Sequence, residues 1–434
     1  MNKSSIQPRL IVHGGAGAIS RANLPPEAYA RYASKLRSVN AETLGLLRDG
    51  TTALDAATHA VRLLEDCPLF NCGKGAVFTR DGTIELEASV MVSKGYRKRG
   101  CGVVLIKHVK NPILLAREIL VRGETDSEGG HNDDGIDPSG GTGGAQGHSV
   151  LGGPTVEALA RKWGLDMVPE SHHWTKKRWD EHKRQLLQSG LPNPNWTQNP
   201  KWPPEEDSWD GREYLPQGTV GCVALDRSGI LCVATSTGGL TNKLSGRIGD
   251  TPTIGAGFWA EEWCCAQMVV NRQPRPQSPL SAIVPDGLFD VWADCMPTMN
   301  GGYNTVPRNL PLDEKQRSAS SIRSYRAVAM SGTGNGDSFL RTAATRTAAA
   351  MARWSGQSLA TSVQEIAGAG GELQRSAGDR WDKTSEGEGE GGIIGIELVN
   401  GVGRIVFDFN CGGMFRAWTD DLGNERVMVF REEY

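Results

Sequence analysis

The sequence predicts an α+β fold in which two layers of β-sheet are covered by helices. Strand-like and helix-like segments occur in blocks and not in strict alternation, which argues against a doubly wound parallel sheet. Two pairs of apolar segments indicate β-hairpins: TVGCVALD with ILCVATST around the turn RSG, and GIIGIELV with RIVFDF near the C-terminus. The chain has 434 residues, of which 38% are hydrophobic, and it shows no internal repeat, so we expect a packed core.

The first half of the chain begins with a short buried strand, RLIV at 9–12, which runs into a glycine turn. Helices are expected at 26–49, where prolines precede the segment and a glycine ends it, and at 52–65, where Ala, Leu and Val recur at helical spacing. Further strands are expected near 76–79, 84–92, 101–107 and 326–332, and further helices over 112–120, 154–163, 172–189, 338–354 and 358–376.

Three polar segments interrupt this pattern. Residues 123–147 are rich in Gly, Asp and Ser and predict a mobile loop. Residues 190–217 contain six prolines and three tryptophans, a composition that favours an extended linker over regular structure. Residues 271–324 have little periodicity and are expected to be an insertion.

Composition excludes several classes of protein. The net charge of −3 provides no basic surface for nucleic acid, and neither a transmembrane segment nor an apolar signal sequence is expected. The nine cysteines are scattered and form no CxxC pair, which is typical of reduced thiols and not of a disulfide framework. We therefore expect a cytoplasmic protein.

The stretch YLPQGTVGCVALD places Gly218 and Thr219 at the border between the proline-rich segment and an apolar strand. A turn glycine followed by a β-branched residue that starts a strand would explain this dipeptide structurally. The chemical explanation is that the Gly218–Thr219 bond breaks and leaves Thr219 as a new N-terminus. A threonine hydroxyl needs a base to act as a nucleophile, and the α-amine of an N-terminal threonine, with a pKa of about 8, can accept its proton.

Three nearby features favour the chemical explanation. Thr237 ends the second strand of the hairpin in TSTGG, so it is expected at the same end of the hairpin as Thr219. Arg247 and Asp250 are three residues apart, and together they can hold the carboxylate and the ammonium of an α-amino acid, although a surface ion pair is the alternative. SGTGNG (331–336) lies between a strand and a helix and can offer N–H groups to an anion, but it matches neither nucleotide-binding glycine pattern.

The region GTVGCVALDRSGILCVATSTGGLTNKLSGRIGDTPTIGAGFWA resembles the signature of plant-type asparaginases, also called isoaspartyl aminopeptidases, which are N-terminal nucleophile hydrolases. The resemblance extends to IVHGGAGAIS and to AVRLLEDCPLFNCGKGAVFTRDG, and it covers most of the chain outside the three polar segments. It implies a four-layer αββα sandwich, with two central, mostly antiparallel sheets flanked by helices. Residues 1–218 would be the α-subunit part of a precursor and residues 219–434 the β-subunit part, together forming one domain.

The resemblance also implies the catalytic residues. Thr219 would be the nucleophile and Gly218–Thr219 the self-cleaved bond, with Thr237 supporting the Thr219 amine or hydroxyl. The hydroxyl of Ser331, where the family usually has threonine, and the N–H of Gly332 would form the oxyanion hole.

Substrate binding is implied for the segment around Arg247. Arg247 would hold the α-carboxylate of the substrate and Asp250 its α-amine. Their pocket would be completed by Ile248, Gly249, Thr333 and Gly334. The family pattern TGTGE becomes SGTGNGD in this chain, about two residues longer, which we expect to alter the depth of the pocket.

The loop LEDCPLFNCGK resembles the sodium-binding loop of the family. The resemblance implies that Asn71 approaches the nucleophile, that no organic cofactor is needed, and that a structural sodium ion is held by backbone carbonyls. These carbonyls would belong to Leu64, Glu65, Cys67, Phe70, Cys72 and Lys74. An ordinary turn at a helix end is the alternative, since carbonyl ligands leave no side-chain pattern.

The resulting prediction is a self-cleaving amidohydrolase that acts on the side-chain amide of L-asparagine, on the isopeptide bond of β-aspartyl dipeptides, or on both, and releases L-aspartate. We expect the protein to bind this small substrate and neither nucleic acid nor membrane. The cleaved α/β heterodimer would pair into a dimer of heterodimers. Three alternatives stay open. Glycosylasparaginases typically carry TNG where this chain has TGG, threonine-aspartase proteases typically lack the aspartate that matches Asp250, and the third alternative is an unprocessed, non-catalytic scaffold.

Overall fold

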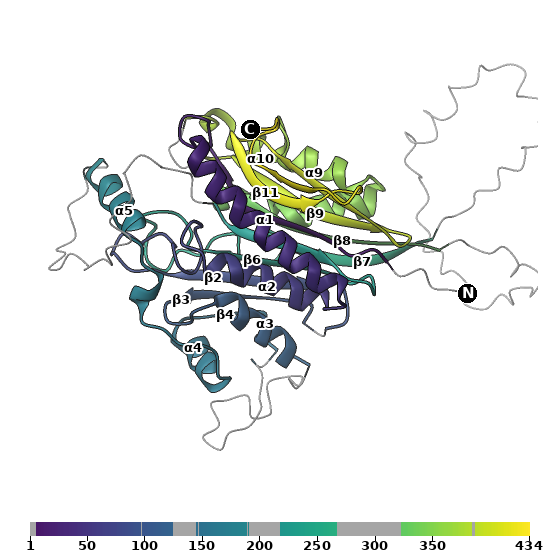
Figure 1. The fold of residues 1–434 in the computed structure, drawn as a ribbon, viewed down its shortest axis with the longest axis horizontal. Coiled ribbons are helices and arrows are strands. Elements are labelled where there is room, and N and C mark those ends of the chain that lie inside the picture. The colour runs from purple at the N-terminus through teal and green to yellow at the C-terminus, as the bar shows by residue number, and fades with distance from the viewer. Residues whose placement is uncertain are drawn as a thin grey trace, which may run out of the picture. The chain divides into compact units, whose positions relative to one another are not determined.

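The structure is a computed structural model that describes residues 6–96, 98–124, 145, 147–188, 190, 218–266, 323–383 and 387–434 (Figure 1). Met1–Trp263 and Tyr325–Tyr434 together form one compact unit, so segments far apart along the chain contribute to the same sheets. The predicted loop, linker and insertion (123–147, 190–217 and 271–324) lie almost entirely outside the described residues, and these three assignments stay predictions.

Among the described residues, the larger sheet has eight strands in the order β12-β11-β1-β5-β6-β2-β3-β4. Neighbouring strands are antiparallel, except for β3 and β4, which run parallel. The strands are β1 (Arg9–Gly17), β2 (Leu86–Val92), β3 (Gly100–Ile106), β4 (Val150–Gly152), β5 (Val220–Leu225), β6 (Leu231–Thr237), β11 (Gly413–Thr419) and β12 (Glu425–Met428). The predicted hairpin is confirmed, since β5 pairs with β6 with Val220 opposite Ser236.

The smaller sheet has the strand order β10-β9-β8-β7 in the described part of the chain. Its strands are β7 (Phe258–Ala266), β8 (Arg323–Gly334), β9 (Gly391–Val399) and β10 (Val402–Phe409). The second predicted hairpin is therefore also confirmed, because β9 and β10 are antiparallel neighbours.

The described apolar side chains gather on both faces of the larger sheet. Cys222 and Ala224 of β5 point into a cluster with residues of α1 (Pro26–Arg48), α2 (Ala53–Glu65) and α3 (Pro112–Arg122). Val223, between them, points the other way and joins a cluster with residues of the smaller sheet such as Ala329 and Ile396. Successive residues of a strand face opposite sides, so β5 is buried on both faces, which explains its unbroken apolar run.

The remaining helices lie outside the inter-sheet cluster. They are α4 (Gly153–Lys162), α5 (Lys176–Gln188), α7 (Gly336–Thr342), α8 (Ala344–Ala350), α9 (Leu359–Ala367) and α10 (Glu372–Ala377), with the short helical turns η2 (Glu170–His173), η5 (Met351–Ser355) and η6 (Gly378–Arg380). Helix α9 packs against β9 and β10 and also against α8 (Figure 1). The predicted class, α+β with two sheets and covering helices, is confirmed.

Several predicted elements differ in detail. The predicted helix 338–354 is broken where Ala343 adopts a left-handed φ of 45° between α7 and α8. The helix expected over 358–376 is divided by a glycine-rich turn between α9 and α10. The strand predicted at 76–79 is wrong: this segment is a loop in which Thr79 forms an isolated bridge with Lys243.

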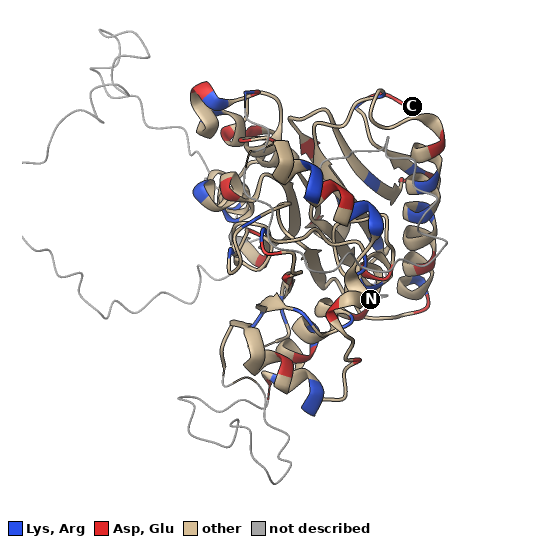
Figure 2. Cartoon of the chain, turned by 90° about the vertical axis from the view of Figure 1, so that its left-hand side faces the viewer, with Lys and Arg blue, Asp and Glu red and all other residues tan. Residues whose placement is uncertain are grey.

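None of the described helices is long and apolar enough to cross a membrane. Figure 2 shows basic and acidic positions interspersed along the described helices. This distribution follows the near balance of 47 basic and 50 acidic residues in the sequence.

Candidate active site

The space between the two sheets changes from apolar to polar at one end. Along β5, the inward positions pass from Leu225 and Val223 to Gly221, and the next such position is Thr219, just before the strand. Strand β8 changes in the same way, from two alanines to two hydroxyl residues: Ala327, Ala329, Ser331 and Thr333. The predicted catalytic residues lie at this polar end.

Thr219 is held by hydrogen bonds from two separate segments. Thr219 is buried, and its Oγ1 lies 2.8 Å from the Oγ1 of Thr251. Its carbonyl oxygen accepts a 2.9 Å hydrogen bond from the hydroxyl of Thr333. The β5–β6 register, continued by one residue, puts Thr219 opposite Thr237, as predicted.

Gly218 lies against the end of β1. A Cβ atom built on Gly218 would be 2.5 Å from the Cα of Gly15, 2.6 Å from the nitrogen of Ala16 and 2.8 Å from the Oγ1 of Thr333. Backbone atoms at such distances cannot be avoided by rotating a side chain, so glycine is needed before Thr219 for steric reasons. The glycine-rich end of β1 and the Gly218–Thr219 bond are therefore packed against each other. The glycine turn predicted after residue 12 is wrong, because β1 continues to Gly17 and pairs there with β11.

Asn71 and Thr237 hold the glycine turn that follows β6. The Nδ2 of Asn71 donates to the carbonyl of Gly239 at 2.8 Å, and the Gly239 N–H donates to the hydroxyl of Thr237 at 3.0 Å. A Cβ atom on Gly238 would lie 2.7 Å from the Oδ1 of Asn71. Asn71 thus lies beside the end of β6. Within the described part of the chain its hydrogen bonds go to Gly239 and Val77 and none reaches Thr219, so its approach to the nucleophile stays a prediction.

Ser331 forms a buried pair with His13. The Ser331 Oγ lies 2.7 Å from the His13 Nε2, and a Cβ atom on Gly221 would be within 2.4 Å of both. Burial lowers the pKa of His13 to about 3, against a smaller opposite effect of the Thr219 carbonyl. His13 is therefore a neutral imidazole over the physiological range, able to donate to or accept from the Ser331 hydroxyl.

The two groups expected to form the oxyanion hole are both engaged in internal hydrogen bonds. The Gly332 N–H donates to the carbonyl of Gly257, the residue before β7, at 2.7 Å. The Ser331 hydroxyl can rotate, whereas the direction of the Gly332 N–H is fixed by the backbone. Gly334 adopts φ +141° against the carbonyl of Glu390, so it shapes the backbone after β8.

Arg247 and Asp250 converge on one point, as their spacing predicted. A Cβ atom on Gly336 would lie 2.4 Å from the Asp250 Oδ1 and 3.0 Å from an Arg247 Nη atom. The Asp250 Oδ2 and the Arg247 Nε are buried, and neither has a hydrogen-bond partner among the described residues. Burial raises the pKa of Asp250 to about 7, against the opposing charge of Arg247. A surface ion pair between Arg247 and Asp250, the alternative interpretation, is disfavoured because Asp250 is buried.

Two carboxylates hold the backbone of this segment. Glu87 accepts a 3.0 Å hydrogen bond from the Gly249 N–H, and Glu85 accepts one of 2.8 Å from the Gly246 N–H. Burial raises the pKa of Glu87, while Lys243 and the Gly249 N–H lower it. Ile248, predicted to line the pocket, is 42% exposed.

Comparison with known proteins identifies the family. The sequence pattern of the family described as asparaginase matches residues 6–126 and 144–268. The isoaspartyl peptidase of Salmonella typhimurium is 30% identical over 100% of both chains, and that of Escherichia coli is 30% identical over 98% of this chain and 96% of its own. The isoaspartyl peptidase/L-asparaginase of Mus musculus is 33% identical over 58% of this chain and 63% of its own. The chain belongs to the asparaginase family.

Membership of the asparaginase family makes the chain a hydrolase, and the predicted resemblance to plant-type asparaginases is confirmed. Both matched segments contribute to the polar end between the sheets. The first contains His13 and Asn71, and the second contains Thr219, Arg247 and Asp250.

In the predicted sodium loop, two glycines lie close to backbone carbonyl oxygens of the same loop. Cβ atoms built on Gly73 and Gly75 would lie 2.4 Å from the Glu65 carbonyl oxygen and 2.8 Å from that of Phe70. Both glycines have positive φ values, so the loop presents carbonyl oxygens where a side chain would otherwise stand. The described residues contain no cluster of three His, Cys, Asp or Glu side chains suited to a metal. The sodium site built from backbone carbonyls stays a prediction.

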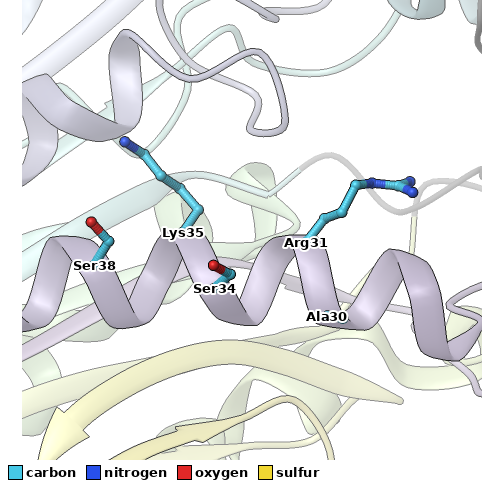
Figure 3. Close-up of a pocket in the computed structure, with 5 residues that line it drawn as sticks. All are labelled: Ala30, Arg31, Ser34, Lys35 and Ser38. Carbon is cyan, nitrogen blue, oxygen red and sulfur yellow. The ribbon is translucent and has the colours of Figure 1, made fainter.

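A separate shallow hollow lies on α1 and contributes none of the predicted site residues. It is lined by Ala30, Arg31, Ser34, Lys35 and Ser38. Figure 3 shows the longer side chains of this set projecting from the outer side of the helix. Its open position on the surface distinguishes it from the buried end of the inter-sheet space.

Sequence reasoning missed residues that reach the site from neighbouring strands. Thr251 carries no signal in the sequence, because a threonine next to a proline is a common structural feature. His13 carries none either, because a single histidine in an apolar strand is equally common. Glu85 and Glu87 did carry a signal, since two acidic residues at alternate positions of an apolar strand must point to the same face.

Proposed function

We propose that this chain is a self-cleaving amidohydrolase that hydrolyses the side-chain amide of L-asparagine and the isopeptide bond of β-aspartyl dipeptides, releasing L-aspartate. The hydrogen bond between Thr219 and Thr251 carries this proposal. Because Thr251 follows Asp250, it brings the nucleophile hydroxyl beside the pair suited to an α-amino acid. The names of the relatives, isoaspartyl peptidase and L-asparaginase, support the same substrates.

Self-cleavage would begin at the Gly218–Thr219 bond. The Thr219 hydroxyl would attack the Gly218 carbonyl carbon and transfer the acyl group from nitrogen to oxygen, and water would then hydrolyse the ester. The products are a Gly218 carboxylate and a free Thr219 amine. The Thr333 hydroxyl bond to the Thr219 carbonyl and the close contact of Gly218 with Gly15 would keep this peptide in place.

Turnover would then use the new amine as the base. It would accept the proton of the Thr219 hydroxyl as this attacks the side-chain carbonyl of the substrate, and ammonia or the second amino acid would leave with a proton. Water would hydrolyse the acyl-enzyme and release aspartate. The Ser331 hydroxyl is the donor that we assign to the oxyanion, while the Gly332 N–H is bonded to Gly257 and is not included.

Substrate recognition would rest on two charges. Arg247 would bind the α-carboxylate and Asp250 the α-ammonium, with Ile248, Gly249, Thr333 and Gly334 around them. The buried Asp250 Oδ2 without a partner among the described residues supports a cationic ligand at this point. A peptide protease would not need this charge, which disfavours the threonine-aspartase alternative.

The finer architecture is proposed as a four-layer αββα sandwich of the N-terminal nucleophile type, supported by apolar clusters on both faces of the larger sheet. After cleavage, we expect residues 1–218 and 219–434 to stay together as a heterodimer and to pair with a second copy. The loop at 64–74 would hold a structural sodium ion, which would stabilise the turn around Asn71. Unpaired cysteine thiols in the described residues support the cytoplasm as the location.

A denaturing gel combined with two product assays tests the function. The mature protein should give fragments of 218 and 216 residues (434 − 218) and release ammonia from L-asparagine and aspartate from a β-aspartyl dipeptide. Thr219→Ala should give a single full-length band without turnover, and Thr219→Ser should retain some cleavage. A parent protein that stays full-length and releases neither product would instead be the non-catalytic scaffold.

A further inference from the structure

We infer that Asp337 competes with the α-carboxylate of the substrate for Arg247 and so sets the affinity of the pocket. This inference rests on the proposed role of Arg247 in substrate binding. The Oδ2 of Asp337 lies 3.1 Å from the Nη2 of Arg247, which puts an internal carboxylate on the guanidinium that the substrate would need.

The local sequence explains how Asp337 reaches this point. Gly336 and Asp337 are the first two residues of α7 and directly follow SGTGN at the end of β8. Asn335 fixes the start of that helix, because its Oδ1 accepts hydrogen bonds from the N–H and the hydroxyl of Ser338.

Gly336 brings this backbone close to the pocket. A Cβ atom at Gly336 would lie 2.4 Å from the Asp250 Oδ1, so a larger residue would push the helix start away. Asp337, the next residue, is therefore anchored beside both Asp250 and Arg247. Its position is a property of the backbone and does not depend on a long, flexible side chain.

The exposures of the two side chains indicate which of them can move. Arg247 is 18% exposed, whereas Asp337 is 59% exposed. The Asp337 carboxylate can therefore turn to solvent when a substrate carboxylate arrives, while Arg247 stays in the pocket. Displacement of such an exposed ion pair should weaken binding of a substrate by about two- to fivefold.

The competition should act on substrate affinity and not on the chemical step. Asp337 would be displaced in the bound substrate complex and equally in the transition state, so its removal should lower KM and leave kcat nearly unchanged. Salt should reduce the effect, because an exposed charge pair is screened at high ionic strength.

The test compares Asp337→Asn with the parent on fully cleaved protein, using L-asparagine and a β-aspartyl dipeptide. We expect KM to fall about two- to fivefold for both substrates at low salt, and kcat to stay within about twofold. Asp379→Asn, which removes another exposed carboxylate, should leave both constants unchanged.

A double-mutant cycle makes the test specific for the pair. In an Arg247→Lys background, Asp337→Asn should lower KM much less than in the parent. Lysine lacks the bidentate guanidinium for which Asp337 and the substrate α-carboxylate compete. An unchanged or raised KM for Asp337→Asn, in a parent that turns over substrate, would overturn this inference alone. Failure of the cleaved parent to turn over either substrate would overturn the proposed function and this inference with it.

Discussion

The hydroxyl oxygens of Thr219 and Thr251 lie 2.8 Å apart at the buried end of the inter-sheet space. Thr251 is itself held in place, because its carbonyl accepts a 2.6 Å hydrogen bond from the hydroxyl of Ser89. Thr251 also follows Asp250 directly. The contact therefore couples the orientation of the proposed nucleophile to the position of the proposed ammonium site.

Thr251→Val should lower kcat because it removes this hydrogen bond while keeping the shape of the side chain. A neutral hydrogen bond contributes about 0.5–1.5 kcal/mol, which corresponds to a loss of roughly two- to tenfold in kcat. KM should change little, and Thr251→Ser should restore most of the rate. The measurement is steady-state kinetics on fully cleaved protein; equal kcat for the valine variant and the parent would remove Thr251 from the positioning of Thr219.

Gly218→Ala should slow self-cleavage. The added methyl group would meet backbone atoms of Gly15 and Ala16 at 2.5 and 2.6 Å, so the scissile peptide must shift. Overpacking of this kind costs about 1–3 kcal/mol, and we expect cleavage to slow by about tenfold or more. The fraction of full-length chain on a denaturing gel, followed over time after synthesis, measures the effect.

A matched glycine variant controls for the loss of glycine as such. Gly45→Ala lies on α1, where a Cβ atom has nothing within 4 Å, and it should cleave at the parent rate. It should also stabilise the helix by about 0.5–1 kcal/mol. Parent-like cleavage by both variants would show that the tight contact around Gly218 is not needed for the reaction.

Arg247→Lys should lower kcat/KM by about one to two orders of magnitude, since a lost charge-assisted hydrogen bond contributes roughly 1.5–3 kcal/mol. Lysine keeps the charge but not the bidentate geometry. Self-cleavage involves no external carboxylate and should be spared. Arg375→Lys, in an exposed ion pair on α10, is the control and should behave as the parent. If Arg247→Lys also matched the parent, the assignment of the α-carboxylate site would fail.

Local patterns in the sequence predicted the hairpins and the Arg247–Asp250 pair, because both depend on residues close together in the chain. Strands β7 and β11 were missed because their partners are remote: β11 pairs with β1, at the other end of the sequence. The contacts of Thr251 and His13 with the site likewise arise only when distant segments are assembled. The ion pair of Asp337 with Arg247 could not be predicted, because the sequence does not show the direction in which the Asp337 side chain points.

His13 should make the stability of the protein fall in acid. Its pKa is about 3 in the folded protein and near 6.5 when unfolded, so the unfolded chain takes up the proton first as the pH falls. The contribution of His13 to the free energy of unfolding is thus fully present above pH 6.5 and is lost as the pH falls towards 3. Between pH 8 and pH 5 this loss amounts to about 2 kcal/mol.

The effect is best measured by denaturant unfolding of the uncleaved Thr219→Ala protein at pH 8 and pH 5. Adding His13→Gln should reduce the difference in unfolding free energy between the two pH values by about 2 kcal/mol. Some difference should remain, because burial also lowers the pKa of His173, to about 4. If His13→Gln kept the full pH dependence, the imidazole beside Ser331 would not be held neutral by burial, and its assigned state in the site would be wrong.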